Sequence, residues 1–295
     1  MKPCLICDGA FAPLRDDVVD WEYGVHWDSS LVRCQTCGLI AQNPPIKSEQ
    51  ITDLYPDNYL AHSPASRSKG IYGGLKETLA RRTARSIAAT IPEGGTLMEI
   101  GCGNGHLLRR IASERPDVRL KGVDIEEVEI TGLANFEFYH GQFEDTQIPP
   151  ESIDLIYCSN LIEHVPDPLR FLRKARSTLK NRGVVHGVTP DHLSVDRYIF
   201  GKFWAGYHYP RHTFIFNHRN IQMLLRKAGF SKTRVRGSYS FWYLSLANRF
   251  QELPGTKKRG VLFAAVTAMF LPLDMLINAM RCHGSMTFIA EKQNL

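Results

Sequence analysis

The chain has 295 residues, of which 43% are hydrophobic, and a formal net charge of +6. This length allows one large domain with a smaller unit beside it, and the hydrophobic content is ample for a buried core. Lysines and arginines are dispersed, with local groups at 81–85 and 257–259, so the sequence lacks the concentrated basic stripe that would indicate a nucleic-acid partner. No basic segment followed by an apolar one marks a secretory signal, and we expect a cytoplasmic protein.

Two pairs of cysteines lie near the start of the chain. Cys4 and Cys7 form one Cys-x-x-Cys knuckle, and Cys34 and Cys37 form another. Each pair can place two thiolates on one metal ion through a tight turn, and four thiolates complete a tetrahedral zinc site. Two disulfides are the alternative, although nothing marks the chain as secreted. The spacing therefore predicts a zinc ribbon over residues 1–45, with a structural metal because no coordination position stays open.

A connector and a helix are expected next, over residues 46–95. Residues spaced by four from Ile71 to Ile87 give an amphipathic helical pattern, and Pro92 ends it. This helix would cover one face of the domain that follows.

Residues 99–105, Glu-Ile-Gly-Cys-Gly-Asn-Gly, are the most informative stretch. They follow a short apolar segment suited to a buried strand and precede a segment with helical spacing from His106. Such a turn brings backbone N–H groups and the positive end of a helix dipole against a ligand. The spacing differs from the Gly-x-Gly-x-x-Gly of pyrophosphate-binding loops, and Glu99 would repel a pyrophosphate. A carboxylate there suits a cation, such as the amino group of a methionine moiety.

A second strand is expected at 120–124, ending in Asp124. An acid at this point can accept hydrogen bonds from a ribose diol, although a helix N-cap is the alternative role. Few residues separate Asp124 from Asn135, so we expect the second crossover helix to be one turn or absent.

Residues 96–230 resemble a class I S-adenosylmethionine-dependent methyltransferase. The further matches are segments 141–145 for adenine, 152–159 for the fourth strand, 160–168 facing the sulfonium, and 179–185 for the fifth strand. The resemblance implies an α/β fold: a Rossmann-like, doubly wound, mostly parallel seven-stranded sheet.

The glycine loop and the resemblance together assign a set of cofactor-binding residues. Gln142 departs from the family, which often has Asp there, but its amide oxygen can still accept from the adenine amino group. The full set is Glu99, Gly101, Cys102, Gly103, Asn104, Gly105, Asp124, Ile125, Gln142, Phe143, Ser159 and Asn160.

Histidines supply the candidates for catalysis. His164 follows the fourth strand, where it could face the substrate or could only cap a helix or pack. The long connection Pro190–Phe216 lacks clear periodicity and is rich in aromatic residues, as suits a functional lid or an ordered structural flap. There His212 is the first choice for general base, because an imidazole with a pKa of roughly 6.5 accepts a proton near neutral pH. His208 and Arg211 would bind the substrate.

The remaining chain reads as strands at 231–237 and 285–291 around a helical insertion at 240–283. The methyltransferase domain would then be residues 96–239 and 284–295. Pro272 and Asp274 interrupt the apolar segment of the insertion, which argues against a membrane-spanning helix. The segment 257–280 would instead be a buried helical pair, a homodimer interface, or an interfacial helix peripheral to the inner membrane.

The combined pattern is similar to bacterial methyltransferases of surface-polysaccharide and sugar-modifying pathways. It favours O-methylation of a saccharide hydroxyl or a related small molecule, with sugar C-methylation close behind. RNA methylation and a non-catalytic, cofactor-binding zinc protein stay open as alternatives.

Overall fold

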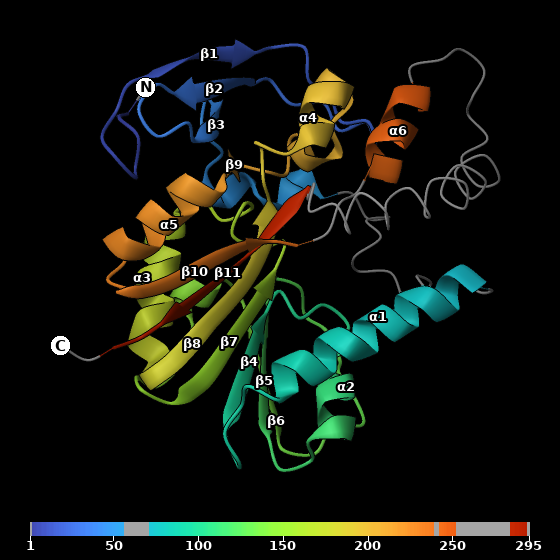
Figure 1. The fold of residues 1–295 in the computed structure, drawn as a ribbon, viewed down its shortest axis with the longest axis vertical. Coiled ribbons are helices and arrows are strands. Elements are labelled where there is room, and N and C mark those ends of the chain that lie inside the picture. The colour runs from blue at the N-terminus through green and yellow to red at the C-terminus, as the bar shows by residue number, and fades with distance from the viewer. Residues whose placement is uncertain (1, 56–70, 239–241, 252–283, 294–295) are drawn as a thin grey trace.

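A seven-stranded sheet forms the centre of the molecule (Figure 1). The structure is a computed structural model, and it describes residues 2–55, 71–238, 242–251 and 284–293. The five strands from β8 to the edge strand β6 pair in parallel, and β11 runs antiparallel to both of its neighbours. In sheet order the strands are β10 (Lys232–Gly237), β11 (Ser285–Glu291), β8 (Leu179–Pro190), β7 (Ile153–Ser159), β4 (Thr96–Ile100), β5 (Arg119–Asp124) and β6 (Phe136–His140). The expected Rossmann-like α/β fold is confirmed.

Helices cover both faces of this sheet. As a result every position of β4 is buried, and its side chains face apolar layers on both sides. Leu97 belongs to one apolar cluster, with Ile87 and Leu108, whereas the next residue, Met98, belongs to the other. The first face carries α1 (Ile71–Ala88) and α2 (His106–Glu114), and the second carries α3 (Pro168–Thr178) and α5 (His218–Lys227) (Figure 1). The helix expected before Pro92 is therefore confirmed as α1.

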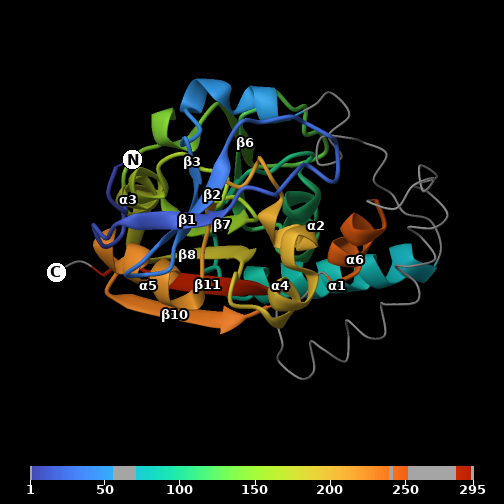
Figure 2. The same cartoon turned by 90° about the horizontal axis from the view of Figure 1, so that it is seen from above.

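A second, four-stranded antiparallel sheet lies over one end of the first (Figure 2). Its strands are β1 (Phe11–Arg15), β2 (Ser30–Cys34), β3 (Ile40–Asn43) and β9 (Phe214–Ile215). The last strand comes from the connection after β8, far from the others in sequence. Gln42 on β3 reinforces this pairing by donating an amide hydrogen bond of 2.8 Å to the carbonyl of His212. The N-terminal unit and the connection 191–217 therefore form one layer.

Short helices fill the joints between these elements. They are η1 (Ser48–Gln50), η2 (Thr52–Leu54), η4 (Phe143–Asp145), α4 (Val195–Phe200), η5 (Gly201–Phe203), η6 (Ala205–Tyr207) and α6 (Trp242–Gln251). No helix lies between β5 and β6, as the short spacing predicts.

Of the expected insertion, 240–283, the structure describes only α6, and the expected strands on either side of it are confirmed as β10 and β11. The proposed membrane or dimer contact through 257–280 lies outside the described residues. Within those residues, no helix is long and apolar enough to cross a membrane.

Candidate active site

A cavity of about 340 Å³ opens at the carboxyl ends of β4, β5, β6 and β7. Parallel strands end at the same edge of a sheet, which brings the loops that follow them together. Residues of the predicted cofactor set that line it are Gly101, Cys102, Gly103, Asn104, Asp124, Ile125, Gln142, Phe143 and Asn160. The other three lie next to this lining: Glu99 within β4, Gly105 before α2, and Ser159 at the end of β7.

The glycine loop is shaped by backbone conformations that side chains disfavour. Gly101 and Gly103 have φ angles of 73° and 47°. The N–H of Gly103 donates to Asp124 Oδ2 at 2.7 Å, and the N–H of Glu126 donates to Oδ1 at 3.1 Å. No helix follows Asp124, so the alternative role as a helix cap is wrong. The carboxylate of Asp124 lines the cavity, and each of its oxygens can accept a further hydrogen bond from a ligand.

Glu99 is a buried carboxyl whose Oε2 has no hydrogen-bond partner among the described residues. Burial, together with the charge of Asp124, raises the pKa of Glu99 to about 8. A cationic group at this point would satisfy the orphaned oxygen and favour ionisation. Donor set and cavity therefore fit S-adenosylmethionine, which carries an ammonium and a ribose.

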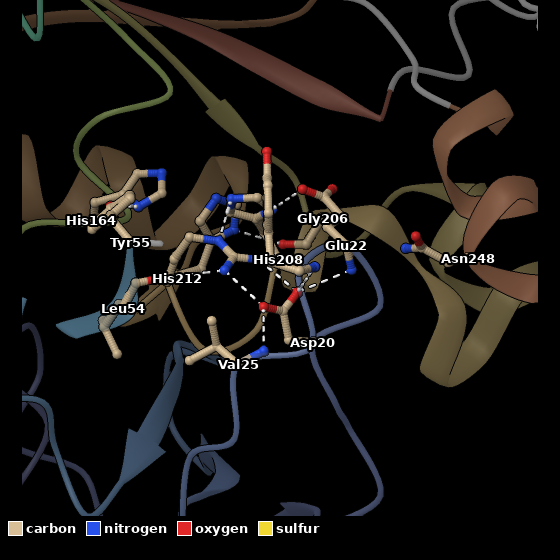
Figure 3. A network of polar contacts seen from close by, with 12 residues as sticks. Asp20, Glu22, Val25, Leu54, Tyr55, His164, Gly206, His208, His212 and Asn248 are labelled. Atoms are coloured by element: carbon tan, nitrogen blue, oxygen red, sulfur yellow. Dashed lines mark hydrogen bonds and ion pairs between the residues drawn. The ribbon is translucent and has the colours of Figure 1, made fainter. Parts of the chain in front are cut away.

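His164 also lines the cavity, from the loop that follows β7. Its Nδ1 lies 2.9 Å from the hydroxyl of Tyr55, and its ring stacks edge-on against His212 with centroids 4.6 Å apart (Figure 3). Burial lowers the pKa of His164 to about 3, with further lowering from His208 and Arg211. The imidazole is therefore neutral at physiological pH.

His212 lies behind His164 and is not part of the lining. Its Nδ1 faces the carbonyl of Gly206 at 2.9 Å, which fixes an N–H on Nδ1 and a lone pair on Nε2. That Nε2 lies 3.8 Å from Oε1 of Glu163. Burial holds the pKa of His212 well below its usual range.

Glu163 is completely buried, and no hydrogen bond of normal geometry reaches either carboxyl oxygen within the described residues. Burial raises its pKa to about 8. The backbone carbonyl of the same residue accepts from the N–H groups of Thr213 and Phe214, at 2.8 and 3.1 Å. The loop after β7 and the connection 191–217 are thereby joined beside the histidines.

The structure contradicts the expected substrate-binding role of Arg211. Its side chain is inaccessible and makes a bidentate ion pair with Asp20, with N–O distances of 2.8 and 2.9 Å. Nε donates to His208 at 2.8 Å, and Nη1 donates to the carbonyl of Leu54. Arg211 therefore joins the connection 191–217 to the N-terminal segment that carries Asp20.

His208 is also held by the layer. Its Nδ1 lies 3.4 Å from Oε2 of Glu22, opposite the contact with Arg211. Its ring packs 5.9 Å from that of His164, and it is not among the residues that line the cavity.

Sequence reasoning missed Tyr55 and Ile51, which line the cavity from the connector after the N-terminal unit. Neither belongs to a motif of known spacing. Only the presence of an aromatic residue in a polar segment set Tyr55 apart.

The four N-terminal cysteines gather as the knuckle spacing predicts. Their sulfurs all lie within 4.8 Å of one another, with Cys4–Cys37 at 3.6 Å and Cys7–Cys34 at 3.5 Å. Zinc–sulfur bonds of about 2.3 Å in a tetrahedron place sulfurs about 3.8 Å apart, whereas a disulfide needs about 2.0 Å. The donor set fits zinc, and in this structure the four cysteines are too far apart to form disulfides.

Comparison with known proteins agrees with this geometry. The methyltransferase domain family matches residues 73–235, more than half of the chain, and the chain therefore belongs to that family. A ubiquinone biosynthesis O-methyltransferase of Neisseria meningitidis serogroup C is 29% identical over 102 residues, which cover 31% of this chain and 42% of that protein. The 27-O-demethylrifamycin SV methyltransferase of Amycolatopsis mediterranei is 30% identical over 122 residues, covering 37% and 44%.

The chain thus spans less than half the length of these curated relatives. Among solved structures, phosphoethanolamine N-methyltransferase 2 of Haemonchus contortus, in complex with S-adenosylhomocysteine, superimposes with a TM-score of 0.50. Its sequence identity is 17%, and the match covers 72% of this chain and 53% of that one. At this identity the likeness shows the fold.

Proposed function

We propose that this protein transfers the methyl group of S-adenosylmethionine to a hydroxyl oxygen of a small molecule. One observation carries the proposal: a single cavity runs from the glycine loop and Asp124 to His164 and Tyr55. A methyl donor at the first end would face an acceptor at the second. S-Adenosylmethionine supplies a methyl group on a sulfonium, which an oxygen nucleophile displaces directly.

The residues of the chain divide this work between the two ends. Asp124 would hold the ribose and Glu99 the ammonium, which would fix the methyl donor at the first end of the cavity. The imidazole of His164, oriented by Tyr55, contacts the acceptor hydroxyl and assists the loss of its proton as the new bond forms. His212 supports that ring from behind.

We propose a saccharide hydroxyl, or a related small molecule, as the acceptor. One matched relative is named as an O-methyltransferase, and the name of the other, 27-O-demethylrifamycin SV methyltransferase, also refers to an oxygen. These names favour oxygen over carbon as the attacked atom. The imidazole and phenol at the acceptor end can both hydrogen-bond to hydroxyl groups. We further propose a structural zinc in the N-terminal unit and a cytoplasmic location.

A transfer assay with methyl-labelled S-adenosylmethionine and a panel of sugar nucleotides and phenols tests this function. His164→Ala should lower kcat by about 10²- to 10⁴-fold with cofactor binding unchanged. His218→Ala, at a largely exposed histidine outside the cavity, is the matched control and should keep full activity. Label on carbon, or equal rates for both variants, would contradict the proposal.

A further inference from the structure

Three metal-ligating side chains converge behind the cavity. Glu163, His164 and His212 each offer one ligand atom, and these atoms lie within 4.8 Å of one another. We propose that they bind one divalent transition-metal cation, separate from the four-cysteine site. Two imidazoles and one carboxylate form a donor set typical of such cations, and three ligands leave positions open.

The orientation of His212 fits a ligand. Its Nδ1–H is directed at the Gly206 carbonyl, so the lone pair of Nε2 is available on the side of Glu163. Metal-binding histidines commonly donate their other ring N–H to a carbonyl in this way. Tyr55 contacts His164 Nδ1 and can fix the orientation of that ring as well.

Glu163 supplies the independent observation. Its carboxyl group is wholly buried, and within the described residues no hydrogen bond of normal geometry reaches either oxygen, although the Thr189 hydroxyl lies close enough to interact weakly. A buried polar group without a partner is costly, and such groups are normally paired or coordinate a metal. Its position is fixed from the backbone, since the carbonyl accepts from Thr213, the residue after His212.

The three groups are close to, but not yet at, ligand spacing. Ligands about 2.1 Å from a metal lie about 3.0 Å apart in an octahedron and about 3.4 Å apart in a tetrahedron, so the side chains would close by up to roughly 2 Å on binding. His164 faces the cavity, and a cation held there would present an open position towards it. Resting on the proposed function, that position would take the acceptor oxygen. The cation would then favour loss of the acceptor proton to solvent, and His164 would assist as a ligand of the cation in place of direct contact with the hydroxyl.

Manganese distinguishes this site from the cysteine cluster, because thiolates select zinc whereas carboxylates suit Mn²⁺. The full chain, loaded with zinc and then freed of loosely held metal by a weak chelator, is titrated with Mn²⁺ and followed by electron paramagnetic resonance. No cofactor or acceptor is present. We expect one saturable Mn²⁺ per chain, and affinity weakened at least tenfold in Glu163→Gln, which keeps the shape of the side chain.

Asp191→Asn is the matched control, because Asp191 and His218 form a carboxylate–imidazole pair 3.5 Å apart outside the cluster. This variant should bind Mn²⁺ as the unmodified protein does. His212→Gln should likewise weaken Mn²⁺ binding. Near-ultraviolet circular dichroism of each variant checks that it is folded. Absence of saturable binding at millimolar Mn²⁺, or equal affinity in Glu163→Gln, would overturn the metal site. Either result is independent of cofactor binding and methyl transfer, which are measured separately.

Discussion

At the scale of single residues, the cofactor end of the cavity was the more predictable one. Gly101 and Gly103 lie in one short segment of the sequence, and Asp124 lies in another. The residue spacing within each segment indicates the local backbone geometry. The acceptor end is assembled from distant segments. Tyr55 reaches His164 across 109 positions, and Arg211 pairs with Asp20 across 191, and no local pattern encodes either contact. The position of Arg211 in a histidine-rich segment therefore suggested a substrate-binding role, and only the structure reveals its buried partner, Asp20.

The raised pKa of Glu99 predicts proton release when the cofactor binds. With a pKa of about 8, its carboxyl is mostly protonated at pH 7, and an ammonium beside it lowers that pKa and drives the proton off. Calorimetry in buffers of different ionisation enthalpy should show roughly one proton released per bound S-adenosylmethionine. The signal should vanish in Glu99→Gln, and its persistence there would exclude Glu99 as the source.

Asp124→Ala tests the ribose assignment. Loss of the carboxylate removes an acceptor for the ribose and leaves the N–H of Gly103 without its partner. Affinity for S-adenosylmethionine should fall at least tenfold, or more than about 1.4 kcal/mol, in an equilibrium titration. Unchanged affinity would refute the assignment.

At the scale of elements, the layer of the N-terminal sheet and the connection 191–217 aligns the histidines. The Asp20–Arg211 pair joins its two parts, and three backbone N–H groups also donate to Asp20. Strand alternation predicts separate strands well, but β9 has only two residues and gains its pairing from β3. Such a strand has no period of its own for a sequence to show.

Asp20→Ala should destabilise this layer strongly. It leaves the guanidinium of Arg211 buried without its charge partner, which costs about 3 to 5 kcal/mol of unfolding free energy. Asp17→Ala removes the acid of a partly exposed pair with Arg15 and should cost at most about 1 kcal/mol. Urea denaturation measures both, and similar losses would mean that burial of the pair contributes little.

At the scale of the whole molecule, the large sheet followed from alternating apolar strands and helices, because each strand–helix unit buries a local pattern. How the N-terminal unit docks did not follow, because that contact depends on tertiary partners. In the structure, Tyr209 donates to the carbonyl of Trp27, and Lys227 of α5 donates to that of Leu5. The N-terminal unit thus holds the connection 191–217, which carries His208 and His212, although none of residues 2–45 lines the cavity.

Metal removal should therefore affect the two ends of the cavity differently, with methyl transfer lost and cofactor binding kept. Elemental analysis is expected to give about one zinc per chain for the cysteine cluster, whose four thiolates fill a tetrahedral site. Strong chelation should lower the melting temperature and abolish methyl transfer, while S-adenosylmethionine still binds the glycine loop. A metal-free protein with the same melting temperature and activity would show that zinc has no such role.

The most direct test of the central claim is calorimetric titration of the unmodified protein with S-adenosylmethionine, S-adenosylhomocysteine and NAD. The cavity beside Glu99 and Asp124 predicts micromolar binding of the first two and none of NAD. Binding of NAD alone would contradict the assignment of the glycine loop, and the methyltransferase function with it.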